Sequence, residues 1–249
     1  MKFITSMTCT GTGILPVINV SICPTFGRNN RASLLTAKAF ALLFATSGTE
    51  NPFWRQRAIT LCLPTIVESC RKVRESNKAP PLSPLLAASH ISCCIPISIL
   101  GRKNIKHLID MNVRGLLNYA LKNDEEKHAV HDYLFVSLAS LLKFLDQVPT
   151  VVMELHKDNI IPILLHLLSS LSAFSNDSNE AICILVLQSL SLVQKYFPKI
   201  NEGAIGCRII SIIGNPNVID HKCKLIRKVA AKVRNEWIVK KDSAISSHV

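Results

Sequence analysis

The chain has 249 residues, of which 48% are apolar, and its formal net charge is +12. Residues 1–110 carry 13 basic and 4 acidic side chains, residues 111–219 carry 8 and 10, and residues 220–249 carry 8 and 3. This uneven distribution argues against a basic nucleic-acid-binding domain, whose positive charge gathers on one folded surface. The chain also contains no run of about 20 apolar residues, the length that spans a bilayer.

The beginning of the chain has little regular pattern. Residues 1–32 are interrupted by glycines and prolines and lack the uninterrupted apolar core of a signal peptide, so we expect them to be irregular or disordered. Residues 33–75 have helical patterns and are predicted to form a partial repeat. Residues 76–107 are expected to be a proline-broken loop or an insertion, irregular or disordered over 76–101. Four prolines lie in that stretch: Pro80, Pro81, Pro84 and Pro96.

Residues 108–241 are predicted to form a series of helices. In the first clear one, apolar residues recur at steps of three and four, which is the period of one helix face. They are Val130, Leu134, Leu138, Leu141 and Leu145. A nearly wholly apolar helix is predicted over 159–174, where Pro162 is tolerated because it would lie in the first turn.

Three further helices are predicted after that apolar one. They cover 180–197, 203–214 and 224–241, and the residues around Pro198 and Gly214 end the first two. Residues 242–249 are expected to be a tail. The runs exceed typical strand length, so an all-α fold is predicted.

These helices repeat along the chain. Pro149 and Pro198 each follow an amphipathic helix and lie 49 residues apart, and Glu180 and His221 lie 41 residues apart. HEAT and armadillo units are about 40–47 residues long. We therefore predict a HEAT/armadillo-type α-solenoid of about three to four helix pairs, with an irregular helical bundle as the alternative.

No pattern of catalytic or cofactor-binding residues is found in the sequence. Motifs for phosphate loops, nucleophile elbows and zinc proteases are absent, and the nine cysteines include no C-x-x-C pair. His128 and His131 share one helix face, but the acidic start of a solvated helix explains this stretch better than a metal does. We predict no enzyme activity, no cofactor and no metal site. Unpatterned cysteines are typical of a reducing compartment.

The helix predicted over 224–241 is rich in Lys and Arg. On a helical wheel Leu225, Ile226, Val229, Ala230, Val233 and Trp237 gather on one side, so Trp237 is expected to pack inward. Most of the basic residues are explained as the polar outer face of a terminal solenoid helix. The candidate partner-binding residues are Lys224, Arg227, Lys228, Lys232, Arg234 and Glu236.

The stretch "LIRKVAAKVRNEWIVK" resembles the closing helix of the MMS nineteen nucleotide excision repair protein family, although Ile238 stands where that family usually has Phe. Residues 33–57 and 108–241 are similar to the C-terminal part of that family, which is several times longer. On this resemblance, we interpret residues 58–107 as an insertion and residues 1–32 as a segment of similar origin.

The resemblance implies a non-catalytic scaffold or adaptor of cytosolic iron–sulfur protein assembly in the cytoplasm and nucleus. Its implied partners are the other subunits of the cytosolic targeting complex and apo iron–sulfur proteins of DNA repair, replication and transcription, such as repair helicases. No membrane or direct nucleic-acid partner is expected. The alternatives are a generic HEAT/armadillo protein-interaction module and a nucleic-acid binder that uses the basic helix.

Overall fold

The computed structural model describes residues 82–94, 96–120, 127–171, 177–201 and 204–246, and the single positions 64 and 68. These residues form helices and no strand, so the all-α prediction is confirmed for this part of the chain. The expectations for 1–32 and for nearly all of 33–75 lie outside the described residues. Two compact units are present, one of residues 1–119 with 124–140 and one of residues 120–123 with 141–249.

Among its described residues, the first unit contains three helices and most of a fourth. These helices are α5 (Leu82–Cys94), α6 (Ile97–Leu100), α7 (Arg102–Ala120) and α8 (Lys127–Gln147), of which α8 continues into the second unit at residue 141. The predicted apolar stripe of α8 is confirmed at its described positions, because Leu134, Leu138, Leu141 and Leu145 are buried.

The expectation of a loop over 76–107 is wrong for the residues described there. The prolines lie where a helix accepts them: Pro84 is the third residue of α5, and Pro96 is the N-cap of α6. A proline in the first turn removes no hydrogen bond, because the first N–H groups of a helix have no partner within the helix. Gly101 then adopts a positive φ of 74° between α6 and α7. Whether this segment is an insertion relative to the family stays a prediction.

Buried contacts between α5, α7 and α8 form the core of the described part of the first unit. The Tyr133 hydroxyl of α8 donates a hydrogen bond to the Asn112 carbonyl oxygen (3.4 Å), and the Asn112 amide donates to the Ser137 carbonyl oxygen (3.1 Å). Gly115 lets Tyr133 approach α7, since a Cβ at Gly115 would overlap the Tyr133 hydroxyl and lie 3.0 Å from a Leu85 methyl group. Residues that the sequence analysis placed in a loop, Leu82, Leu85 and Leu86, are fully buried.

The second unit contains the remaining helices. They are the end of α8, α9 (Pro149–Leu171), α10 (Asp177–Tyr196), the 3-10 helix η1 (Pro198–Asn201), α11 (Ala204–Ile213), α12 (Pro216–Ile219) and α13 (Lys224–Ser246). The predicted boundary between helix and tail at residue 242 is wrong, because α13 continues to Ser246.

Helix α9 is broken at His156, whose backbone angles (φ −142°, ψ 23°) are not helical. The predicted helix over 159–174 corresponds to the segment after the break, while the segment before it, which begins at Pro149, was not predicted. The missing N–H of Pro149 costs nothing at a first helical position. Pro162 lies six residues after the break, beyond the first turn in which it was expected. The break divides α9 into a short first segment and a longer apolar one.

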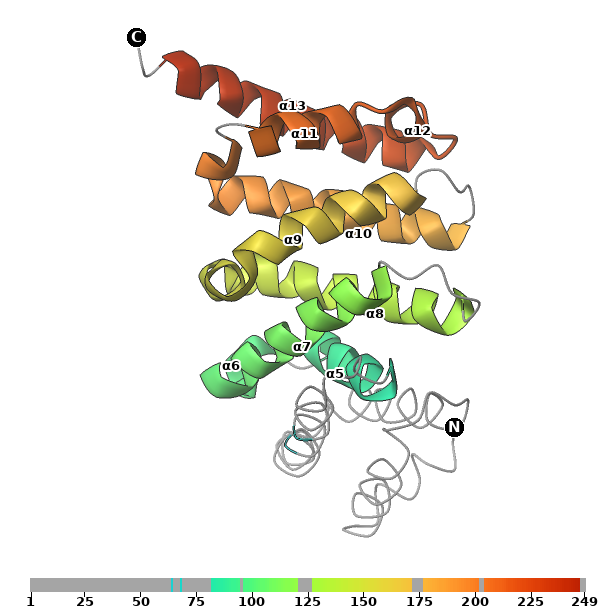
Figure 1. Cartoon of the computed structure of the whole chain (residues 1–249), viewed down its shortest axis with the longest axis vertical. Coiled ribbons are helices and arrows are strands. Elements are labelled where there is room, and N and C mark those ends of the chain that lie inside the picture. Colours follow the sequence, from blue (N-terminus) through green and yellow to red (C-terminus); the bar gives the residue numbers. More distant parts are fainter. Residues whose placement is uncertain are drawn as a thin grey trace. The chain divides into compact units, whose positions relative to one another are not determined.

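Figure 1 shows α10 returning along α9, with α11 and α13 on the next level of the second unit. Helix α9 packs against both α10 and α11, while α10 and α11 each pack against α13. The core between them is almost wholly aliphatic, as with Ile160, Leu164, Val186 and Ile209, which are all completely buried. This packing fixes one side of α13 and leaves its other side to solvent.

Candidate functional site

The turn before α13 determines where this helix begins. Asn215 caps α12 by accepting a hydrogen bond from the Asn217 N–H (2.9 Å), and Pro216 follows at the first helical position. After α12, the buried His221 accepts a hydrogen bond through Nδ1 from the Cys223 N–H (3.0 Å). These local contacts close the turn and direct the chain into α13 at Lys224.

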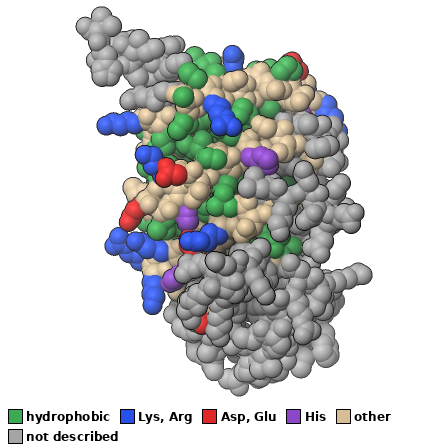
Figure 2. Space-filling model, in the orientation of Figure 1, with side chains coloured by type: hydrophobic (Ala, Val, Ile, Leu, Met, Phe, Trp, Pro, Cys, Tyr) green, Lys and Arg blue, Asp and Glu red, His purple; other side chains and the backbone are tan. Residues whose placement is uncertain are grey.

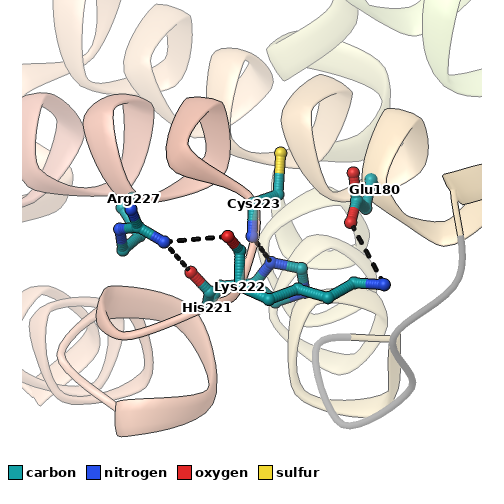
Figure 3. Close-up of polar contacts among 5 residues, drawn as sticks. All are labelled: Glu180, His221, Lys222, Cys223 and Arg227. Carbon is teal, nitrogen blue, oxygen red and sulfur yellow. Dashed lines mark hydrogen bonds and ion pairs between the residues drawn. The ribbon is translucent and has the colours of Figure 1, made fainter.

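Arg227 holds this turn in place. Its Nη1 donates to the carbonyl oxygens of His221 (2.6 Å) and Lys222 (2.9 Å), as Figure 3 shows. Hydrogen bonds from a charged donor are about twice as strong as neutral ones. Because the guanidinium reaches back to the segment before its own helix, we assign Arg227 mainly to the structure of the turn.

A weaker contact joins the same turn to α10. Lys222 Nζ lies 3.8 Å from Glu180 Oε1, and Figure 3 shows the lysine side chain extending toward that carboxylate. The lysine side chain is 55% exposed, so this ion pair adds little stability. Lys222 is a basic residue that the sequence analysis did not select, because it precedes the helix and no helical wheel includes it.

The side of α13 that faces the second unit is apolar. Ile226, Ala230, Val233 and Trp237 are buried, and Trp237 is completely inaccessible. The prediction that Trp237 packs inward is therefore confirmed. Leu225, which the wheel assigned to the same side, is instead 53% exposed.

Two of the candidate residues flank the buried side of α13. Glu236 accepts a hydrogen bond from the Ser191 hydroxyl of α10 (2.6 Å) and lies 3.8 Å from Lys232 Nζ. Arg234 is partly buried beside the end of α11, where a Cβ added at Gly214 would lie 3.5 Å from its Nε. Both side chains therefore contribute to the packing of α13 on the unit. Ser191 was not a candidate, and only the fold brings it to Glu236.

The other candidates lie on the open side of α13. Lys224, Lys228 and Lys232 are exposed and follow one another at intervals of four residues. With about 100° of rotation per residue, this spacing places them along one line of the helix surface, with Leu225 beside it. Together, we name Lys224, Leu225, Lys228 and Lys232 the lysine strip. The six predicted residues thus do not form one site: Arg227, Arg234 and Glu236 have structural contacts, and the three lysines face solvent.

The cysteines of the second unit differ in exposure. Cys183 is buried in α10, and burial together with the nearby Glu180 carboxylate raises the pKa of its thiol from 9.0 to about 11. Cys207 is exposed on α11. Within the described ranges, no group of three or more His, Cys, Asp or Glu side chains is placed to hold a metal ion.

Two properties of the wider surface bear on partners. None of the described helices is both long and apolar enough to cross a membrane. On the face that Figure 2 shows, Lys and Arg side chains are interspersed with apolar ones and form no continuous basic surface.

Comparison of the chain with known protein families, curated proteins and solved structures found no match. Its function is therefore inferred from its own residues and their geometry.

Proposed function

We propose that this chain is a non-catalytic adaptor built as a HEAT-type α-solenoid, which binds protein partners along its stacked helices. The observation that carries this proposal is the packing order of the second unit. Helix α9 packs against α11, and α10 packs against α13. Each helix of one pair thus contacts its counterpart in the next pair, which is how solenoid repeats cover one another's apolar faces.

The sequence repeat supports the same architecture. Pro149 and Pro198, 49 residues apart, begin α9 and η1. At this spacing the buried Ile160 and Leu164 of α9 correspond to the buried Ile209 and Ile213 of α11. Equivalent positions therefore contribute to the core in both pairs, as expected when one structural unit is repeated along a chain.

For its partners, we propose the proteins of cytosolic iron–sulfur assembly, in the cytoplasm and nucleus. The support is the resemblance of the 225–240 stretch to the closing helix of an adaptor family of that pathway. The structure supplies a reason for part of that pattern, since Arg227 holds the turn, Glu236 binds Ser191 and Trp237 fills the core. The adaptor would bring the subunits of the targeting complex together with apo iron–sulfur proteins of DNA repair, replication and transcription.

Nucleic-acid binding by α13 is the less favoured function. A single-strand binder stacks bases on exposed aromatic side chains, whereas the aromatic residue in the described part of α13, Trp237, is completely buried. Nη1 of Arg227 donates to two backbone carbonyl oxygens, which holds the guanidinium against the turn. The remaining lysines provide charge without a stacking surface.

Affinity purification of the tagged whole chain from cytosol, with nuclease treatment, tests this proposal. We expect the iron–sulfur assembly proteins to be recovered over a tag-only control, and recovery to survive the nuclease. Recovery of other protein complexes alone would indicate a generic helical-repeat module. Recovery of nucleic acid without assembly proteins would contradict the adaptor function, and its binding would fall steeply with salt.

A further inference from the structure

We infer that the lysine strip of α13 is a docking surface for an acidic amphipathic helix of a protein partner. This inference rests on the proposed adaptor function, since it names the chemistry of the partner and the residues that receive it. Lys224, Lys228 and Lys232 supply the positive charge, and Leu225 supplies an apolar contact among them.

Among the residues that the structure describes, the charge of the strip is largely uncompensated. Within the described residues, no ion pair or hydrogen bond involves the side chain of Lys224 or Lys228. Lys232 lies 3.8 Å from Glu236, but its side chain is 74% exposed, so this ion pair is weak. Glutamates of a partner helix at the same four-residue spacing would face all three lysines.

The position of Lys224 is unfavourable for α13 itself. Lys224 is the first residue of the helix, and the first turn contains no acidic side chain. The N-terminal end of a helix carries partial positive charge, so basic residues there are electrostatically repelled and acidic ones are favoured. Helix electrostatics therefore do not favour Lys224, and an acidic partner would compensate its charge.

Leu225 indicates that the partner is a protein segment with apolar residues. It is one of the few large apolar side chains in the described ranges that are more than a third exposed, and it lies next to Lys224 and Lys228. An amphipathic helix that binds a groove or face provides apolar anchors at helical spacing. A nucleic acid would use the lysines and leave Leu225 without a role.

The test uses the purified whole chain and a labelled helical probe peptide with Glu along one edge and Leu at helical spacing. A peptide with Gln in place of Glu and an oligo-dT strand are compared. We expect the Glu peptide to bind, the double variant Lys224→Glu/Lys228→Glu to weaken it about tenfold, and Leu225→Ala to weaken it several-fold. The wild-type chain is expected to bind the Gln peptide no more tightly than the double variant binds the Glu peptide.

Lys103→Glu is the matched control, because Lys103 is also an exposed lysine in the first turn of a helix, here α7. It reverses one charge in the first turn of a helix, as Lys224→Glu alone does, so these two single variants are compared with each other. Because Lys103 is not part of the lysine strip, its variant is expected to bind the Glu peptide as the wild type does. The melting temperature of Lys224→Glu is expected to be unchanged or higher, which separates lost binding from lost folding.

Three results would overturn the inference. The first is equal binding of the Glu and Gln peptides by the wild-type chain. The second is a loss of Glu-peptide binding in the Lys103 variant as large as that in the strip variants. The third is tighter binding of oligo-dT than of the Glu peptide, with no effect of Leu225→Ala. The adaptor function can fail separately. If wild-type chain recovers no assembly protein from cytosol but binds the Glu peptide through the strip, the docking chemistry holds and the assigned pathway is wrong. If assembly proteins are recovered equally by wild type and double variant, the pathway holds and the strip is not the docking surface.

Discussion

At the scale of single residues, burial and hydrogen bonding decide which charged side chains are available to a partner. Arg227 and Lys228 are neighbours in the sequence, yet the first is directed to two backbone carbonyls and the second is exposed. Glu236 is likewise held by Ser191 across 45 residues of sequence. The charge of a residue in the sequence therefore did not identify the role of its side chain, because the fold determines which groups the side chain contacts.

For the substitution Gly115→Ala, helix propensity and packing predict changes of opposite sign in the free energy of unfolding. Helix propensity alone predicts that Gly115→Ala stabilises α7 by up to about 1 kcal/mol. Because the new Cβ would overlap the buried Tyr133 hydroxyl, we expect destabilisation by about 1–3 kcal/mol in urea unfolding. Adding Tyr133→Phe is expected to recover part of the loss. A stabilised Gly115→Ala variant would show that the two helices do not approach this closely.

The raised pKa of the Cys183 thiol predicts a specific loss of stability at high pH. Its thiol has a pKa of about 11 in the folded chain against 9.0 ordinarily, since burial and Glu180 disfavour the thiolate. Unfolding above pH 9 therefore releases a proton, and the free energy of unfolding should fall between pH 9 and 11, by up to about 2–3 kcal/mol. Below pH 9 this contribution is fully present.

The comparison variant for this measurement is Cys183→Ala, followed by urea unfolding at several pH values. Lysines and tyrosines titrate equally in both proteins, so the difference between their pH profiles isolates the thiol. Parallel profiles from pH 9 to 11 would mean that the Cys183 thiol is not buried as described.

At the scale of elements, sequence patterns predicted α8, α10, α11 and the apolar part of α9, and they missed α5, α6 and the start of α7. The stripe on α8 and the ends of α10 and α11 agree closely with the sequence patterns. Helix α5 was missed because its apolar residues surround it without a stripe, and because prolines that begin helices were taken as helix breakers. The break in α9 at His156 has no proline or glycine to mark it.

Sequence patterns also did not predict the contacts of the turn before α13. Arg227→Met would remove two charge-assisted hydrogen bonds to the carbonyls of His221 and Lys222. We expect the variant to lose about 1–2 kcal/mol of stability in urea unfolding, the lower part of the range for such bonds, because the turn is partly open to water. Lys228→Met, one residue along, is expected to change stability by less than about 0.5 kcal/mol. Equal effects of the two substitutions would remove the structural role given to Arg227.

At the scale of the whole molecule, the stacking of the helix pairs determines which side of α13 is exposed. Stacking of α11 and α13 on α9 and α10 buries Ile226, Ala230, Val233 and Trp237 and leaves the lysine strip on the open side. The sequence predicted the all-α class, and its repeat period favoured a solenoid. It could not separate the structural charges of α13 from the exposed ones, because that requires knowing where Ser191 and the turn carbonyls lie.

The central claim is that this chain binds iron–sulfur assembly proteins through the exposed side of α13. The most direct measurement is parallel affinity purification with three baits: the wild-type chain, Lys224→Glu/Lys228→Glu and Lys103→Glu. We expect assembly proteins to be recovered equally by the wild type and the Lys103 variant, and about tenfold less by the double variant. Recovery of no assembly protein by the wild type, or equal recovery by all three baits, would contradict it.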